Sequence, residues 1–246
     1  MRILLTNDDG IHARGLEALT EAVKDLGEVE VIAPEQEQSA ASHSLSLHRP
    51  LRVRQHGPGR RSVDGTPADC VYLALHHLLR DARPDLVLSG INHGPNLATD
   101  VFYSGTVAAA REAALAGLPA VAFSLVAFKA FDFSHAAAFA RRVVQAHQAR
   151  PLPPGMLLSV NVPQGAPAGA TLTSLGRHSY GSDVSEKDDP RGRPYFWIGG
   201  TSYGYEKLPG TDVVAVHDER KIAVTPLALD LSHAQGVAAL QGWLPG

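Results

Sequence analysis

The chain has 246 residues, of which 44% are hydrophobic and 19% are charged, a composition typical of a globular protein with a substantial core. Its formal net charge is −3 and no run of Lys and Arg occurs, so we expect no nucleic-acid-binding surface. The single cysteine, Cys70, excludes an internal disulfide and fits a reducing compartment. With no signal-peptide pattern and no apolar stretch long enough to span a bilayer, we expect a cytoplasmic protein without a membrane anchor.

Strand and helix patterns alternate over the first two-thirds of the chain. Short apolar or alternating runs predict strands at 3–5, 29–33, 45–53, 86–88, 120–125 and 157–162. Apolar residues at helical spacing, with caps at their ends, predict helices at 16–26, 66–78, 105–116 and 134–149. Such alternation favours right-handed crossovers, an α/β fold and a mainly parallel sheet.

The pattern changes after Pro163. Residues 171–230 carry Gly, Pro and most of the tyrosines without a helical period, which predicts β-hairpins with a charged turn through 186–190. Residues 232–243 can form a short helix. We therefore interpret 1–246 as one domain, with an α/β core at 1–163 and a hairpin-rich part at 164–246.

The most informative feature is the pair of adjacent carboxylates, Asp8 and Asp9, directly after the first predicted strand. In an α/β protein this is the ligand-binding edge of the sheet. Two like charges at contact range repel by roughly 3–4 kcal/mol at an effective dielectric constant near 20, so the pair does not hold a phosphate by itself. It can hold a hard divalent cation, which can then hold an anion.

Polar side chains also follow the next strands. Ser39 and Ser42 lie in the loop after the second strand, and Asn92 lies in the Gly/Asn-rich loop after the strand at 86–88. Loops after parallel strands meet at one sheet edge, so these oxygens can join those of Asp8 and Asp9. An all-oxygen set suits Mg²⁺, Mn²⁺ or Ca²⁺ rather than structural zinc.

The segment Ser104-Gly105-Thr106 opens the predicted Ala-rich helix and can supply an anion site. Backbone N–H groups at a helix start, with hydroxyl groups beside them, bind phosphate, and Gly105 lets the backbone approach closely. A cation on one side and this helix start on the other could hold a phosphoryl group between them.

Each feature also has a purely structural interpretation. Asp9-Gly10 is a common turn dipeptide. Ser39, Asn92 and Ser104 can serve only to bond a turn or cap a helix. Most of the 12 histidines carry no recognised metal spacing, although His12 and His93 lie in the loops of the predicted site. The joint position of the polar residues after successive strands is what favours a functional site.

Several motifs together resemble the SurE family, the survival-protein nucleotidases. They are spread along the chain in the family's order: ILLTNDDGI at 3–11, GTPADC at 65–70, SGINHGPN at 89–96, YSGTV at 103–107 and TPL at 225–227. The resemblance implies a Rossmann-like three-layer fold, hydrolysis of nucleoside 5′-monophosphates, and homodimers or homotetramers built by exchange of C-terminal elements. It also implies one divalent cation per subunit, Mg²⁺ or Mn²⁺. Nucleoside 3′-monophosphates and short polyphosphate are further candidate substrates.

By the family's pattern, Asp8, Asp9, Ser39 and Asn92 are the expected metal ligands. Asn96 and the turn formed by Ser104, Gly105 and Thr106 are the expected neighbours of the substrate phosphate. One segment departs from the pattern: after Ala33-Pro34 the family commonly has Asp-Arg-Asn-Arg-Ser-Gly, whereas 35–40 here reads Glu-Gln-Glu-Gln-Ser-Ala. The serine keeps its place but both arginines are missing, so this loop offers no basic side chain to the phosphate.

The leading hypothesis is a phosphomonoesterase of the acid-phosphatase type, in which a metal-activated water attacks phosphorus and Asp8 or Asp9 acts as the general base. An alternative makes Asp8 a nucleophile that forms an aspartyl-phosphate. A second alternative is a non-catalytic nucleotide-binding oligomer, although the first loop lacks G-x-G-x-x-G. A third is an assembly protein whose function depends on the hairpins alone.

Overall fold

The computed structural model describes residues 1–180, 184–198 and 203–243. Within these residues one sheet of nine strands forms the centre of the fold. In spatial order its strands are β3 (Val53–Gly57), β4 (Arg60–Val63), β2 (Glu28–Pro34), β1 (Arg2–Thr6), β5 (Leu86–His93), β6 (Ala120–Val126), β7 (Leu157–Pro163), β13 (Ile222–Leu227) and β8 (Ala170–Leu172). All neighbours pair in parallel except β3 with β4 and β13 with β7. The predicted α/β fold with a mainly parallel sheet is therefore confirmed.

Helices cover both faces of this sheet and make three layers. One face packs against α1 (Arg14–Val23) and α4 (Ser134–Ala149), and the other against α2 (Pro67–Leu73) and α3 (Gly105–Leu115). The four central strands β1, β5, β6 and β7 bury almost every side chain between the layers, which explains their short uninterrupted apolar runs. In the described residues, no helix is both long and apolar enough to cross a membrane.

Local capping explains where α2 and α3 begin. The Thr66 side chain accepts a hydrogen bond from the Asp69 N–H at 3.1 Å, and the Asp69 carboxylate accepts one from the Thr66 N–H at 2.9 Å. Pro67 follows at the first helical position, where its missing N–H costs nothing. At α3, the Ser104 side chain accepts from the Val107 N–H at 3.1 Å. Helix α2 continues through a π turn, Ala74–Leu78, so the predicted helix at 66–78 is confirmed.

The predicted strand at 45–53 is wrong. Leu45 and Leu47 are 39% and 78% exposed, so their alternation with polar residues does not mark a half-buried strand. The chain instead forms the β3–β4 hairpin just beyond. The pattern missed it because β3 is an edge strand whose residues are almost all exposed.

The Gly/Asn-rich segment after the strand predicted at 86–88, which we expect from the sequence to be a loop, is more ordered than that. Strand β5 continues to His93 through an irregularity in its pairing with β6, and Ala98–Phe102 form a short 3₁₀ helix. Asn92 therefore stands at the end of a strand rather than in a free loop.

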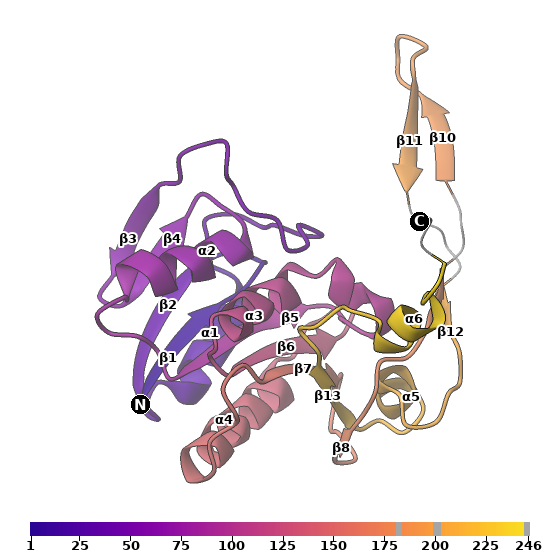
Figure 1. Ribbon diagram of the computed structural model, residues 1–246. Helices are drawn as coiled ribbons and strands as arrows, with labels where there is room; N and C mark the ends of the chain where they lie inside the picture. The colour runs from indigo at the N-terminus through magenta and orange to yellow at the C-terminus, as the bar shows by residue number, and fades with distance from the viewer. Residues whose placement is uncertain (181–183, 199–202, 244–246) are drawn as a thin grey trace.

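The C-terminal part mixes predicted hairpins with elements that the sequence did not reveal. Two antiparallel pairs form, β9 (His178–Tyr180) with β12 (Tyr203–Tyr205) and β10 (Val184–Asp188) with β11 (Pro194–Ile198). Figure 1 shows the β10–β11 hairpin standing away from the sheet. Its turn lies at 189–193 rather than 186–190, where the Asp189 carboxylate accepts N–H bonds from Arg191 and Arg193.

Between the hairpins and the C-terminus, the chain returns to the main body. Helix α5 (Asp212–His217) packs against β13 and β7, and α6 (Ala234–Ala239) is the short helix predicted within 232–243. The expectation of hairpins alone over 171–230 is therefore wrong for α5, β8 and β13. Six helical residues are too few to show a period, and the apolar run that starts β13 was lost among turn residues.

Candidate active site

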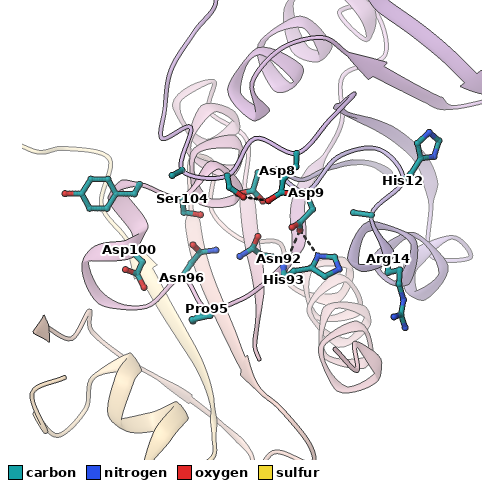
Figure 2. A pocket seen from close by; sticks show the side chains of 15 residues that line it. Asp8, Asp9, His12, Arg14, Asn92, His93, Pro95, Asn96, Asp100 and Ser104 are labelled. Carbon is teal, nitrogen blue, oxygen red and sulfur yellow. Dashed lines mark hydrogen bonds and ion pairs between the residues drawn. The ribbon is translucent and has the colours of Figure 1, made fainter. Parts of the chain in front are cut away.

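A cavity of about 680 Å³ opens at the edge of the sheet where β1 and β5 end. Figure 2 shows Asp8, Asp9, Asn92 and Asn96 gathered near its centre. The full lining is Asp8, Asp9, His12, Ala13, Arg14, Glu37, Ser39, Ala40, Asn92, His93, Pro95, Asn96, Asp100, Tyr103 and Ser104. Six of the eight residues predicted for the site thus line one cavity; Gly105 and Thr106 lie behind its wall.

The turn after β1 is shaped by Asn7 and Gly10. The Asn7 side-chain amide donates to the Gly10 carbonyl oxygen at 2.9 Å. Gly10 has φ of +101°, and a Cβ there would come within 3.3 Å of the Gln36 backbone, so only glycine fits without strain. The Gln38 N–H donates to the Asp8 carbonyl oxygen at 2.8 Å, which ties the loop after β2 to this turn. Both carboxylates are thereby presented at the strand end.

Thr106, at the start of α3, holds the Asp8 carboxylate. Its N–H donates to Oδ2 of Asp8 at 3.0 Å and its hydroxyl donates to Oδ1. A Cβ at Gly105 would lie 2.8 Å from the Asp8 Cβ, so the absence of a side chain lets the helix start come this close. This corrects the simplest form of the predicted phosphate site: Thr106 is fully buried, and both of its donors bind Asp8 rather than face the cavity.

The Asp8 carboxyl group is 7% exposed, and its environment favours the neutral form. The pKa of Asp8 is raised from 3.8 to about 6: burial is the largest cause and the nearby Asp9 charge acts in the same direction, while the hydrogen bonds from Thr106 act in the opposite direction. An ionised Asp8 therefore lacks sufficient positive charge around it. A bound cation would supply that charge.

Asp9 is less buried than Asp8 and contacts His93. Its Oδ2 accepts a hydrogen bond from the His93 N–H at 3.3 Å and lies 3.0 Å from the ring Nδ1. Both contacts are drawn in Figure 2. The sequence singles out His93 only by its place in the loop of the predicted site, and the structure shows that its partner is Asp9.

Asn92 and Ser39 bring two further side-chain oxygen atoms to the lining of the cavity. The Asn92 side-chain amide donates to the Gly94 carbonyl oxygen at 3.0 Å, so its oxygen is the atom left to act as a ligand. Ser39 is exposed, lines the same cavity and donates to a Glu37 carboxylate oxygen at 2.5 Å. Ser42, a further candidate from the sequence, donates to the Phe102 carbonyl oxygen at 2.7 Å and serves the loop's structure.

Asn96 is fixed by a buried polar network that the sequence did not predict. Its N–H donates to the Asn161 side-chain oxygen at 2.9 Å, and the Asn161 amide donates back to the Asn96 carbonyl oxygen at 3.0 Å. The Asn96 side-chain amide donates to the Ser124 hydroxyl at 2.8 Å. Ser124 and Asn161 are polar residues inside otherwise apolar strands, which was the available signal. Ser104 is also at the wall, but its hydroxyl caps α3.

The donor set fits a hard divalent cation with few protein ligands. Within the part of the chain that the structure describes, no three His, Cys, Asp or Glu side chains gather closely enough to hold a metal ion. The two carboxylates, the Asn92 oxygen and the Ser39 hydroxyl are all oxygen donors, which suits Mg²⁺ or Mn²⁺ better than structural zinc. So small a set leaves coordination positions for water and for a substrate.

Comparison with known proteins agrees with this geometry. The family model described as "Survival protein SurE" matches residues 3–182. The chain belongs to the SurE family. Full-length relatives named 5′-nucleotidase SurE include one from Myxococcus xanthus, 57% identical over 98% of this chain and 93% of its own, and one from Anaeromyxobacter dehalogenans strain 2CP-C, 55% identical over 100% and 97%.

A solved structure of the SurE family shares the whole fold. The crystal structure of the Sure protein from Aquifex aeolicus superposes with a TM-score of 0.88 at 38% identity, and the match covers 99% of both chains. The likeness extends over the C-terminal part as well as the α/β core. The SurE fold predicted from the motifs is thereby confirmed.

Proposed function

We propose that this SurE-family protein is a metal-dependent 5′-nucleotidase that hydrolyses nucleoside 5′-monophosphates to nucleoside and phosphate. Relatives that bear the name 5′-nucleotidase SurE are more than half identical over nearly the full chain, which supports the activity. The observation that carries the proposal within the structure is the buried Asp8 beside Asp9 at the sheet edge, with too little positive charge around it.

We assign Asp8, Asp9, Ser39 and Asn92 as the ligands of one Mg²⁺ or Mn²⁺ per subunit. Such a cation would neutralise phosphoryl oxygens and make a neighbouring water more acidic. Asp8 is the fixed member of the set, because Thr106 engages both of its oxygens. Asp9 is held through one oxygen and faces the cavity, so we assign it as the group that accepts the proton of the attacking water.

Asn96 and Ser104 are assigned to the phosphate side of the cavity. The Asn96 amide uses one N–H toward Ser124, and its second N–H is available for a phosphoryl oxygen. Gly105 and Thr106 act behind this wall: they place Asp8, and they bring the start of α3 within reach of the developing negative charge. The start of α3 therefore belongs to the site because it positions Asp8, even though the side-chain donor of Thr106 does not face the cavity.

The aspartyl-phosphate route through Asp8 fits the geometry less well. A nucleophilic carboxylate needs an oxygen exposed to phosphorus, whereas Asp8 is 7% exposed with both oxygens hydrogen-bonded. Rapid acid quench during turnover, followed by mass analysis of peptides that contain Asp8, tests this. A phosphorylated Asp8 that forms and decays at the rate of turnover would replace our assignment with the covalent one.

The C-terminal part supports a homodimer or homotetramer that exchanges elements between subunits. The hairpin β10–β11 extends from the body and carries exposed apolar side chains, among them Phe196, Trp197 and Ile198 at 57%, 65% and 92% exposure. Apolar area of this kind on an extended hairpin is typical of an interface. We keep the division into a core at 1–163 and an exchange part at 164–246 as part of this proposal, together with a reducing, cytoplasmic location that fits the single Cys70.

A panel of phosphorylated substrates tests the activity directly. We expect phosphate release from nucleoside 5′-monophosphates with Mn²⁺ or Mg²⁺, its loss with chelator, and its return when metal is restored. Nucleoside 3′-monophosphates and short polyphosphate belong in the panel as further candidate substrates. Tight nucleotide binding without hydrolysis under every metal tested would favour the non-catalytic alternative. Full activity in excess chelator would contradict the metal-dependent mechanism.

A further inference from the structure

The two contacts between His93 and Asp9 meet at a single carboxylate oxygen. The His93 backbone N–H donates to Oδ2 at 3.3 Å, and the ring Nδ1 lies 3.0 Å from the same atom. The ring N–H is not well aligned with that oxygen, so the second contact is electrostatic in this geometry. Among the residues that the structure describes, Oδ1 of Asp9 receives no hydrogen bond, which leaves one oxygen held and the other open to the cavity.

The His93 ring is itself held by two aromatic side chains. Phe131 and Phe133, which follow β6, meet its ring edge-to-face, with centroid distances of 5.0 and 4.8 Å and interplanar angles of 73° and 74°. The two phenyl rings are nearly parallel to each other, at 11°. Phe133 is 6% exposed and belongs to the core cluster beneath α1, so the position of the imidazole is fixed by the packing of the fold.

We propose that His93 is a positioning residue that orients the Asp9 carboxylate for cation binding, with Phe131 and Phe133 keeping its ring in place. This inference rests on the proposed function, since it takes Asp9 as a ligand of a divalent cation. With its hydrogen on Nδ1, the imidazole turns a positive edge toward Oδ2 at 3.0 Å, although this contact is not a well-aligned hydrogen bond. Together with the hydrogen bond from the His93 backbone N–H, this attraction fixes which oxygen of Asp9 faces away from the cavity and removes a rotation that binding would otherwise have to freeze.

Two substitutions of His93 separate positioning from packing. His93→Phe keeps a planar ring between the two phenyl groups and removes the Nδ1 donor. His93→Asn loses most of the ring but places an amide nitrogen where Nδ1 stands. Mn²⁺ affinity, measured by titration calorimetry on the metal-stripped full-length protein without substrate, should weaken about 10- to 100-fold in His93→Phe, the usual loss when the partner of a metal ligand is removed.

The conservative variant and a matched control complete the test. His93→Asn should bind Mn²⁺ within a few-fold of wild type even if its melting temperature falls more than that of His93→Phe. His12→Phe changes an exposed histidine on the same cavity that packs edge-on to His56 and does not contact Asp9, so its Mn²⁺ affinity should equal wild type. Phe131→Leu should give an intermediate loss of Mn²⁺ affinity, because the imidazole keeps its Nδ1 but loses one of its two aromatic contacts.

The outcomes distinguish this inference from the proposed function. If His93→Phe binds Mn²⁺ as tightly as the wild-type protein, and the wild-type protein releases phosphate, the positioning role of His93 is overturned and the proposed function stands. Equal losses of affinity in His93→Phe and His93→Asn that follow the fall in melting temperature indicate a packing role and also overturn it. A wild-type protein that neither binds Mn²⁺ nor releases phosphate contradicts the proposed function and this inference with it.

Discussion

Asp8→Asn should stabilise the metal-free protein while it destroys the site. Asn has nearly the same shape, and its oxygen and amide can still pair with the N–H and hydroxyl of Thr106. The substitution removes the negative charge that the Asp8 carboxylate places in a buried position. A pKa raised from 3.8 to about 6 means that ionised Asp8 lowers the free energy of unfolding by about 3 kcal/mol above pH 7.

The sign of the pH dependence follows from proton binding. Between pH 3.8 and about 6, the folded state keeps a proton on Asp8 that the unfolded state has lost, so the stability of the metal-free protein falls as pH rises through this window and levels off above it. The Asn variant lacks this fall. The variant should therefore match wild type near pH 4 and exceed it by up to about 3 kcal/mol at pH 7.5.

Urea unfolding in excess chelator, at equal protein concentrations and at both pH values, measures this difference. Asp25→Asn is the matched control: Asp25 lies on the surface, and the Arg141 guanidinium holds its pKa at about 2, so losing its charge should not stabilise the protein. Adding Mn²⁺ should raise the stability of wild type and leave Asp8→Asn unchanged. An Asp8→Asn protein less stable than wild type at pH 7.5 in chelator would refute the buried-charge argument.

Three further predictions test the supports of the site. Gly105→Ala should weaken Mn²⁺ affinity and reduce phosphate release at least 10-fold, since its Cβ would come within 2.8 Å of the Asp8 Cβ; unchanged affinity by calorimetry would refute that close approach. Asn161→Leu should lower the free energy of unfolding by about 2–4 kcal/mol, because it leaves buried groups of Asn96 unpaired, and urea unfolding at pH 7.5 would show it. Cys70 should stay unreactive toward a thiol reagent until the protein unfolds, since burial raises its pKa well above the usual value; rapid labelling of native protein would contradict this.

The sequence predicted the parts of the fold that depend on strong local patterns. The buried strands β1, β5, β6 and β7 appear as short apolar runs, and capping residues such as Thr66 and Ser104 mark where helices start. Parallel strands bring their carboxyl ends together, so the sequence alone predicts that residues following β1, β2 and β5 meet at one sheet edge. These features need no knowledge of distant contacts.

The sequence could not predict what depends on packing between distant segments. The hydrogen bonds from Thr106 to Asp8 join residues 98 positions apart, and they turn an expected phosphate donor into a support for a carboxylate. Asn161 and Ser124 stand out only as polar residues in apolar strands, and nothing near them in the sequence identifies Asn96 as their partner. The edge strand β3 shows no alternation because almost all of its side chains are exposed. In each case the structure depends on a contact, or on the lack of one, that the neighbouring sequence does not reveal.

The most direct test of the central claim is the rate of phosphate release from a nucleoside 5′-monophosphate by Asp8→Asn and Asp9→Asn at saturating Mn²⁺. Circular dichroism and the elution volume on gel filtration serve as checks that the fold and assembly are intact. We predict that each variant loses at least two orders of magnitude in kcat/KM, about 2.7 kcal/mol or more of transition-state stabilisation. Turnover close to wild type in either folded variant would contradict the assignment of these two carboxylates as the centre of the active site.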